Sequence, residues 1–191
     1  MELRAEPGCL LAAWPDLKDP NFSHSVVLVV QHNDQGAFGL VLNRPLDATV
    51  DQLLPEHPVL GSLSTRVHLG GPVDHTRMQF LHCLGEELPG GHEVVPGLWL
   101  GGELEALAVK LSAGGEDAAD GSTPGVRLFV GYAGWEAGQL EQELAEGSWV
   151  PASFDAESVF GPTGEPCWRS VVRSVEGGED LASRPPDISW N

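Results

Sequence analysis

Basic residues are scarce in this sequence. Its 191 residues include 10 lysines and arginines against 28 acidic residues, so the formal net charge at pH 7 is −18. Non-specific binding to DNA and to anionic membranes depends on basic side chains that neutralise phosphate groups. The composition therefore disfavours direct nucleic-acid binding and binding to acidic membrane surfaces, unless the few arginines gather on one face.

Long apolar segments are also missing. No stretch approaches the roughly 20 apolar residues that a membrane helix needs. The strongest apolar run, residues 26–30, has the length of a buried strand. The N-terminus lacks the apolar core of a signal peptide. We therefore expect a cytoplasmic protein without a membrane segment.

Cysteine is rare, and neither cysteines nor histidines show metal-binding spacing. The three cysteines, Cys9, Cys83 and Cys167, are odd in number and far apart, which favours free buried thiols over a disulfide framework. His68 and His82 lie on expected strands and would converge if those strands were neighbours, but a strand histidine is more often a structural residue. We therefore expect no metal and no cofactor.

The apolar patterning predicts strands and helices in one α+β domain over residues 1–191. Residues 26–32 and 37–43 form two apolar runs around a turn, as in a β-hairpin. Apolar residues over 104–111 recur at helical spacing, and Thr49 with Gln52 fits a capping box. The end of the chain, residues 176–191, is expected to be a tail.

The chain is organised around residues 126–149. We expect a strand over residues 126–130, a tight turn punctuated by Gly131 and Gly134, an amphipathic helix, and a left-handed cap at Gly147. A glycine turn before a helix can bind phosphate. However, acids outnumber bases here and no nucleotide-binding fingerprint is present, so tight packing is the preferred reason for the glycines.

Four sequence blocks, in this order along the chain, resemble the YqgE/AlgH family of bacterial proteins. They are Asp19-Pro20-Asn21-Phe22 with Ser25-Val26-Val27-Leu28, Gly36-Ala37-Phe38-Gly39-Leu40-Val41-Leu42-Asn43-Arg44-Pro45, Gly70-Gly71-Pro72-Val73 with Leu81-His82, and Gly131-Tyr132-Ala133-Gly134-Trp135 with Gly138-Gln139-Leu140-Glu141 and Glu143-Leu144. The resemblance covers about Gly8 to Trp168. It implies an α+β fold with a mixed, strongly bent, barrel-like sheet flanked by helices. It implies no established activity; members are often labelled transcriptional regulators, on genetic more than chemical grounds.

The resemblance also carries family motif positions onto this sequence, and these form the candidate ligand or partner site. The residues are Asn43, Arg44, Gly71, His82, Tyr132, Trp135, Gln139 and Glu143. A planar guanidinium such as that of Arg44 can bind a carboxylate or phosphate bidentately. Its ordinary role would be an internal ion pair with one of the many acids.

No reactive constellation is recognisable in the sequence. There is no nucleophile elbow, and His82 and Cys83, as neighbours on a strand, point to opposite faces. We therefore expect a non-catalytic binding or regulatory protein, acting on a protein partner or small-molecule ligand in a cleft beside the Gly131 turn. The alternative is an unrecognised hydrolase or transferase with a cleft around Arg44, His82 and Tyr132. Direct transcriptional regulation is disfavoured by the charge.

Overall fold

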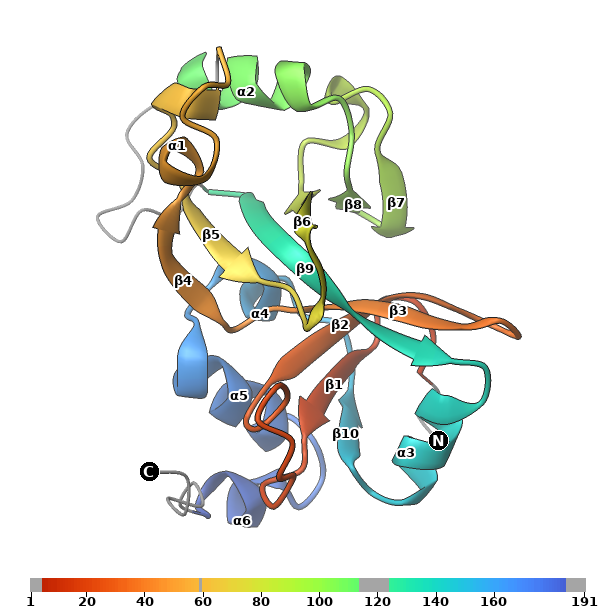
Figure 1. Cartoon of the computed structure of the whole chain (residues 1–191). Coiled ribbons are helices and arrows are strands. Elements are labelled where there is room, and N and C mark those ends of the chain that lie inside the picture. Colours follow the sequence, from red (N-terminus) through yellow and green to blue (C-terminus); the bar gives the residue numbers. More distant parts are fainter. Residues whose placement is uncertain (1–4, 59, 114–123, 185–191) are drawn as a thin grey trace.

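The computed structural model describes residues 5–58, 60–113 and 124–184, which form an α+β fold (Figure 1). The strands are β1 (Leu10–Ala13), β2 (Val26–Asn33), β3 (Gly36–Val41), β4 (Pro45–Thr49), β5 (Arg66–Leu69), β6 (Val73–His82), β7 (His92–Val95), β8 (Leu98–Leu100), β9 (Val126–Glu136) and β10 (Trp149–Ala152). The helices are α1 (Val50–Leu53), α2 (Leu104–Ala113), α3 (Gln139–Ala145), α4 (Ala156–Phe160), α5 (Gly164–Arg173) and α6 (Gly178–Ala182), with 3₁₀ segments η1 (Leu60–Ser62) and η2 (Gly85–Glu87). None of these helices is long and apolar enough to cross a membrane.

The strands form one ten-stranded sheet in the order β10-β1-β2-β3-β9-β6-β8-β7. β4 and β5 lie off this path and join it through β5, whose pairing with β9 is parallel; the other pairs are antiparallel. β9 runs across the middle of the molecule in Figure 1 and pairs with β3, β5 and β6. Within the described residues the end strands β10 and β7 do not pair, so the sheet is open. The α+β class is confirmed; the barrel-like bend is not.

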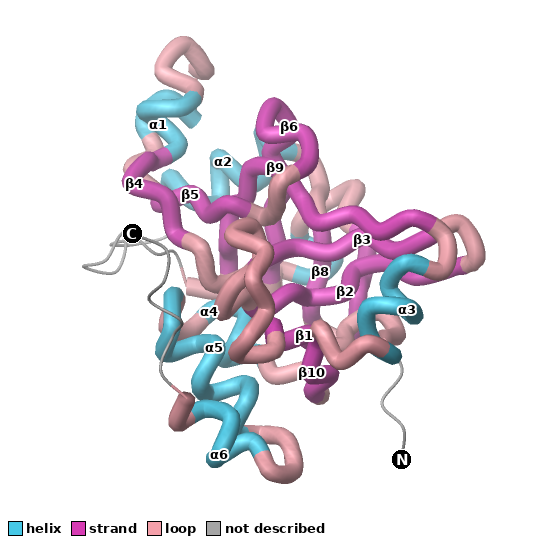
Figure 2. The backbone as a smooth tube through the Cα atoms, turned by 60° about the horizontal axis from the view of Figure 1, so that its bottom comes forward, coloured by secondary structure: helices cyan, strands magenta, loops and turns pink. Residues whose placement is uncertain are grey.

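The buried strand expected over residues 26–30 is part of β2, which lies between β1 and β3 in the sheet. Its alternating residues face two different clusters of buried apolar side chains, with Leu28 in one and Val27 in the other. α5 packs on β1, β2 and β10 and covers the first cluster with Trp168, whereas α3 packs on β3, β9 and β10 beside the second cluster (Figure 2). A third cluster lies between the sheet and α1 and α2 and includes Val67 and Leu107.

The prediction of a tight turn at Gly131 and Gly134 is wrong. β9 continues through both glycines to Glu136, and the turn falls at residues 137–138, before α3. Gly131 adopts a φ of +71°, and a Cβ there would lie 2.6 Å from the carbonyl oxygen of Gly71. The glycine therefore permits close approach of a neighbouring strand end within the sheet. The cap predicted at Gly147 is confirmed, with a φ of +76° directly after the helix.

Part of the tail expected over residues 176–191 is helical. Residues 178–182 form α6, which packs on α5 and buries Ala182. The prolines and apolar residues of the last segment, residues 185–191, lie outside the described residues. That residues 1–191 form one domain ending in a tail stays a prediction.

The three cysteines are free thiols, as predicted, but they are not all buried. Cys9 and Cys167 are buried, and burial raises the pKa of each thiol to about 11. Cys83 is exposed just after the end of β6, and partial desolvation raises its pKa above the usual value for a thiol. None of the three thiols is shifted toward the reactive thiolate form.

Candidate functional site

Asn43 joins three segments that are far apart in the sequence. Its side-chain oxygen accepts a hydrogen bond from the Val26 N–H at 2.9 Å. Its amide nitrogen donates to the carbonyl oxygens of His24 and Gly164, both at 2.9 Å. The side chain is 3% exposed. Asn43 thus satisfies backbone groups at the start of β2, in the preceding loop and at the start of α5.

Arg44 holds the loop that precedes β2. Its guanidinium donates to the carbonyl oxygens of Pro20 at 3.0 Å and Ser23 at 3.1 Å. Burial lowers the pKa of Arg44, and the nearby carboxylate of Asp19 opposes this shift. The internal partners are thus two backbone carbonyls, in place of the expected acidic side chain.

Gly71 and Tyr132 meet where the β5–β6 connection crosses β9. Gly71 has a φ of +151°, and a Cβ there would lie 2.2 Å from the carbonyl carbon of Tyr132. The Tyr132 ring packs against Phe38 with centroids 5.1 Å apart. The carbonyl oxygen of Gly71 also accepts a hydrogen bond from the His75 ring at 3.0 Å. Close packing against Tyr132 therefore accounts for a glycine at position 71 without a bound ligand.

Trp135, Gln139 and Glu143 form a connected set around one carboxylate. Oε2 of Glu143 accepts hydrogen bonds from the indole N–H groups of Trp135 and Trp149, both at 2.8 Å. Oε1 of Glu143 accepts from the Gln139 amide at 2.8 Å. Phe22 packs on both indoles, at centroid distances of 6.4 and 5.4 Å. This carboxylate anchors α3 to β9 and β10.

His82 is fully buried, and its ring nitrogens both bond to the backbone. Nε2 lies 2.9 Å from the carbonyl oxygen of Gly101, and Nδ1 accepts from the Leu84 N–H at 3.2 Å. This pattern requires a neutral ring with its proton on Nε2. Burial lowers the pKa of His82, although the bond to Gly101 opposes the shift. A ring held in this way is poorly placed to exchange protons with a substrate.

The suggested convergence of His68 and His82 does not occur. β5 and β6 pair with opposite edges of β9, so β9 separates the two strands that carry these histidines. Within residues 5–58, 60–113 and 124–184, no group of three or more histidine, cysteine or acidic side chains could hold a metal ion.

The eight candidate residues fall into four sets of contacts: Asn43 with Arg44, Gly71 with Tyr132, Trp135 with Gln139 and Glu143, and His82 alone. No hydrogen bond or ring contact joins Arg44, His82 and Tyr132 to one another in the described part of the chain. That the eight residues form one ligand or partner site stays a prediction, because their described contacts are internal.

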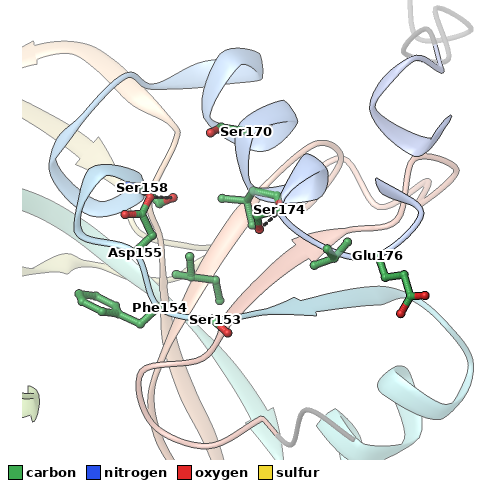
Figure 3. A pocket seen from close by; sticks show the side chains of 10 residues that line it. Ser153, Phe154, Asp155, Ser158, Ser170, Ser174 and Glu176 are labelled. Carbon is green, nitrogen blue, oxygen red and sulfur yellow. Dashed lines mark hydrogen bonds between the residues drawn. The ribbon is translucent and has the colours of Figure 1, made fainter. Parts of the chain in front are cut away.

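A cavity of about 390 Å³ lies elsewhere, between α5 and residues 153–158 (Figure 3). This volume is within the usual range for small-molecule sites, roughly 300–1,000 Å³. It is lined by Leu10, Ser153, Phe154, Asp155, Ser158, Ser170, Val171, Ser174, Val175 and Glu176. None of the candidate site residues predicted from the sequence lines this cavity. Its one local signal is the i, i+4 spacing of Ser170 and Ser174, which places both hydroxyls on one side of α5.

Hydroxyl and carboxylate groups supply the polar chemistry of the cavity. Asp155 caps α4 by accepting from the Glu157 N–H at 3.2 Å and from the Ser158 N–H and hydroxyl at 3.1 and 3.0 Å. The Ser174 hydroxyl donates to the Val171 carbonyl at 2.7 Å, drawn dashed in Figure 3. The lining residues include no histidine, cysteine, lysine or arginine. They can bind a ligand through hydrogen bonds and apolar contacts, but they present no serine–histidine or cysteine–histidine pair.

The fold and the cavity define a small α+β protein with an open mixed sheet and a ligand-sized hollow beside its C-terminal helices. Residues 10–179 match the family model described as AlgH-like. The chain therefore belongs to the AlgH-like family, and the resemblance found in the sequence is confirmed.

Relatives match over nearly their whole length. The UPF0301 protein CT0663 of Chlorobaculum tepidum is 40% identical over 183 residues, which cover 96% of this chain and 94% of the relative. A UPF0301 protein of Chlorobium luteolum is 36% identical, with coverages of 97% and 94%. The solution structure of AlgH from Pseudomonas aeruginosa is 28% identical with a TM-score of 0.70 and covers 94% of both chains. The crystal structure of DIP2367 from Corynebacterium diphtheriae, at 23% identity and a TM-score of 0.74, covers 97% and 95% and shows the fold alone.

Proposed function

We propose that this protein is a non-catalytic binding protein with a regulatory role, and that it recognises a small molecule in the cavity between α5 and residues 153–158. The observation that carries the proposal is the make-up of this cavity. It has a volume of about 390 Å³ and combines apolar side chains with serine hydroxyls and carboxylates. Such a mixture binds and orients a ligand.

The contacts of the earlier candidates favour binding over catalysis. His82, one of the cleft residues expected for the alternative hydrolase or transferase, is buried and hydrogen-bonded to backbone groups through both ring nitrogens. Arg44, the expected anion-binding group, donates to two loop carbonyls. Either residue would have to break internal hydrogen bonds before it could act on a substrate.

The charge of the protein favours regulation through a ligand over regulation through direct contact with DNA. The net charge of −18 repels the phosphate backbone. We therefore also propose that the protein is cytoplasmic, that it responds to a metabolite, and that it does not bind duplex DNA by itself. A gel-shift experiment at low salt should accordingly show no complex.

The binding proposal is tested by screening ¹⁵N-labelled full-length protein against small amines, carboxylates, sugars and nucleotides by NMR. A binding compound should shift amide signals from residues 153–158 and 170–176, and its own spectrum should stay unchanged during prolonged incubation. Ser170→Trp fills the cavity from α5 and should abolish the shifts. Ser112→Trp, at an exposed position of α2 outside the lining, is the matched control and should leave them intact.

Three results would overturn the proposal. The cavity is not a binding site if no compound shifts these signals, or if Ser170→Trp and Ser112→Trp bind the compound equally well. Chemical conversion of a bound compound that is lost in Ser170→Trp would make the protein an enzyme.

A further inference from the structure

The backbone of the loop before β2, residues 19–25, is held by side chains from outside the loop. Asn43 donates a hydrogen bond to the carbonyl oxygen of His24 at 2.9 Å, and Arg44 donates to two further carbonyl oxygens of the loop. An amide and a guanidinium both keep their protons over the physiological pH range. These anchors of the 19–25 loop are therefore insensitive to pH.

His24 joins this loop to α5 through its ring. Its φ of +53° lies in the left-handed region, which a residue with a Cβ seldom adopts. In this conformation the ring packs on Trp168 of α5, with the ring centroids 4.5 Å apart and the ring planes at 72°. Trp168 is fully buried in the apolar cluster that α5 covers. The strained backbone at His24 is thus linked to a contact between the loop and the core.

The two ring nitrogens of His24 differ in their contacts. Nδ1 lies 3.2 Å from the hydroxyl oxygen of Ser23, whereas Nε2 is buried and has no hydrogen-bond partner among the described residues. A neutral ring carries a proton on one nitrogen only, but a protonated ring has N–H groups on both. Protonation of the ring in this position would therefore bury an N–H group without an acceptor, which is unfavourable.

The charged groups around the ring do not remove this penalty. Burial is the largest effect and lowers the pKa of His24; Glu165 of α5 opposes the shift, and Arg169 of α5 adds to it. Glu165 and Arg169 also pair with each other. On the loop side, the charges of Arg44 and Asp19 are likewise opposite in sign. A histidine freed from this position would bind a proton more readily, so acid favours opening of the loop.

We propose that His24 is a pH-sensitive switch that controls the 19–25 loop. The neutral ring packs on Trp168 and keeps the loop against α5, whereas the protonated ring leaves this contact and the loop opens. The loop should be closed above about pH 6.5 and should open increasingly often below it. The inference does not depend on the proposed ligand, because His24 and Trp168 lie outside the lining of the cavity.

Amide hydrogen exchange in ¹⁵N-labelled full-length protein, followed by NMR at pH 7.5 and pH 5.5, tests the switch. The amides of Ser25 and Val26 report on opening, because they donate to the Phe22 carbonyl and the Asn43 side chain. After correction for the intrinsic effect of pH on exchange, their protection factors should be about fivefold lower at pH 5.5. At that pH they should also exchange faster than the amides of β9, because the loop opens without unfolding of the sheet.

Variants identify the group that titrates. His24→Phe keeps a ring against Trp168 without a titratable nitrogen, so its protection factors should be the same at both pH values. If His24→Phe does not fold, His24→Asn replaces it, because asparagine tolerates the left-handed region. His92→Gln is the matched control, since it removes an exposed histidine of β7 and should leave the fivefold change intact.

The switch is ruled out by any of three results. An equal pH response in the unchanged protein and the His24 variant, or loss of the response in His92→Gln, would show that another group titrates. Higher protection at pH 5.5 would show that Trp168 or Glu165 attracts the protonated ring and keeps the loop closed. Equal protection of the loop amides and the β9 amides would show that the loop opens only when the whole protein unfolds.

Discussion

Removal of the Glu143 carboxylate should destabilise the protein more than removal of any ordinary surface acid. Oε2 of Glu143 accepts hydrogen bonds from two indole N–H groups, and Oε1 accepts from Gln139. The indoles of Trp135 and Trp149 are 6% and 4% exposed. In Glu143→Ala both indole donors would lose their partner while remaining largely buried.

The expected loss follows from these two donors. A buried hydrogen-bonding group left without a partner costs about 1–3 kcal/mol. Glu143 itself is half-buried, so water can reach part of the vacated space and the cost per indole should lie toward the lower end. We expect the free energy of unfolding to fall by about 3 kcal/mol, which lowers the Tm by about 6–12 °C for a chain of this size.

Urea unfolding followed by circular dichroism measures the loss, and tryptophan fluorescence reports on the indole environment. Glu146→Ala is the matched control, because Glu146 follows the same helix and its exposed carboxylate accepts a hydrogen bond from exposed Gln142. It should change stability by less than about 0.5 kcal/mol. Glu143→Gln, which keeps one acceptor oxygen, should fall between the two. If Glu143→Ala and Glu146→Ala unfold at the same urea concentration, the carboxylate does not anchor α3 and the reasoning is wrong.

Two further predictions test the packing of β9 and the state of the buried histidine. Gly71→Ala should cost about 3–5 kcal/mol, because its Cβ would lie 2.2 Å from Tyr132 backbone atoms, whereas Gly97→Ala, with φ at +86° and no atom within 4 Å, should cost about 1–2 kcal/mol; equal urea midpoints would contradict this. Burial holds the pKa of His82 below the ordinary histidine value of about 6.5, so the unfolded chain binds a proton more readily and stability should decrease as pH falls below about 6.5. Urea midpoints measured from pH 5 to pH 8 should show a shallower decrease in His82→Gln than in the unchanged protein, and identical slopes would refute the assignment.

Elements with a strong local pattern could be predicted from the sequence. The apolar run of residues 26–30 indicated a buried strand, and the structure places the alternating residues of β2 in two separate clusters of buried side chains. The capping box at Thr49 is formed, with the Gln52 side chain accepting from the Thr49 N–H at 3.1 Å. Likewise, apolar spacing located α2, whose Leu107 and Ala108 are buried. In each case the signal depends on neighbours within a few residues.

The role of a glycine could not be predicted from the sequence where a tertiary contact requires it. Gly131 was interpreted as a turn residue because a turn and a close strand contact both favour glycine. The structure decides for the contact, since the space that a side chain at Gly131 would need is taken by Gly71 and His75.

The sequence by itself determined the family, the α+β class and the strong negative charge, because motifs, apolar periodicity and composition are local or additive properties. Only the tertiary structure decided which polar groups meet. It engaged His82 and Arg44 with backbone groups, gathered two indoles on Glu143, and opened a cavity between residues 153–158 and α5. These contacts depend on how β9 and the helices pack across the sheet. They join residues that are far apart in the sequence, so the spacing of residues along the chain does not predict them.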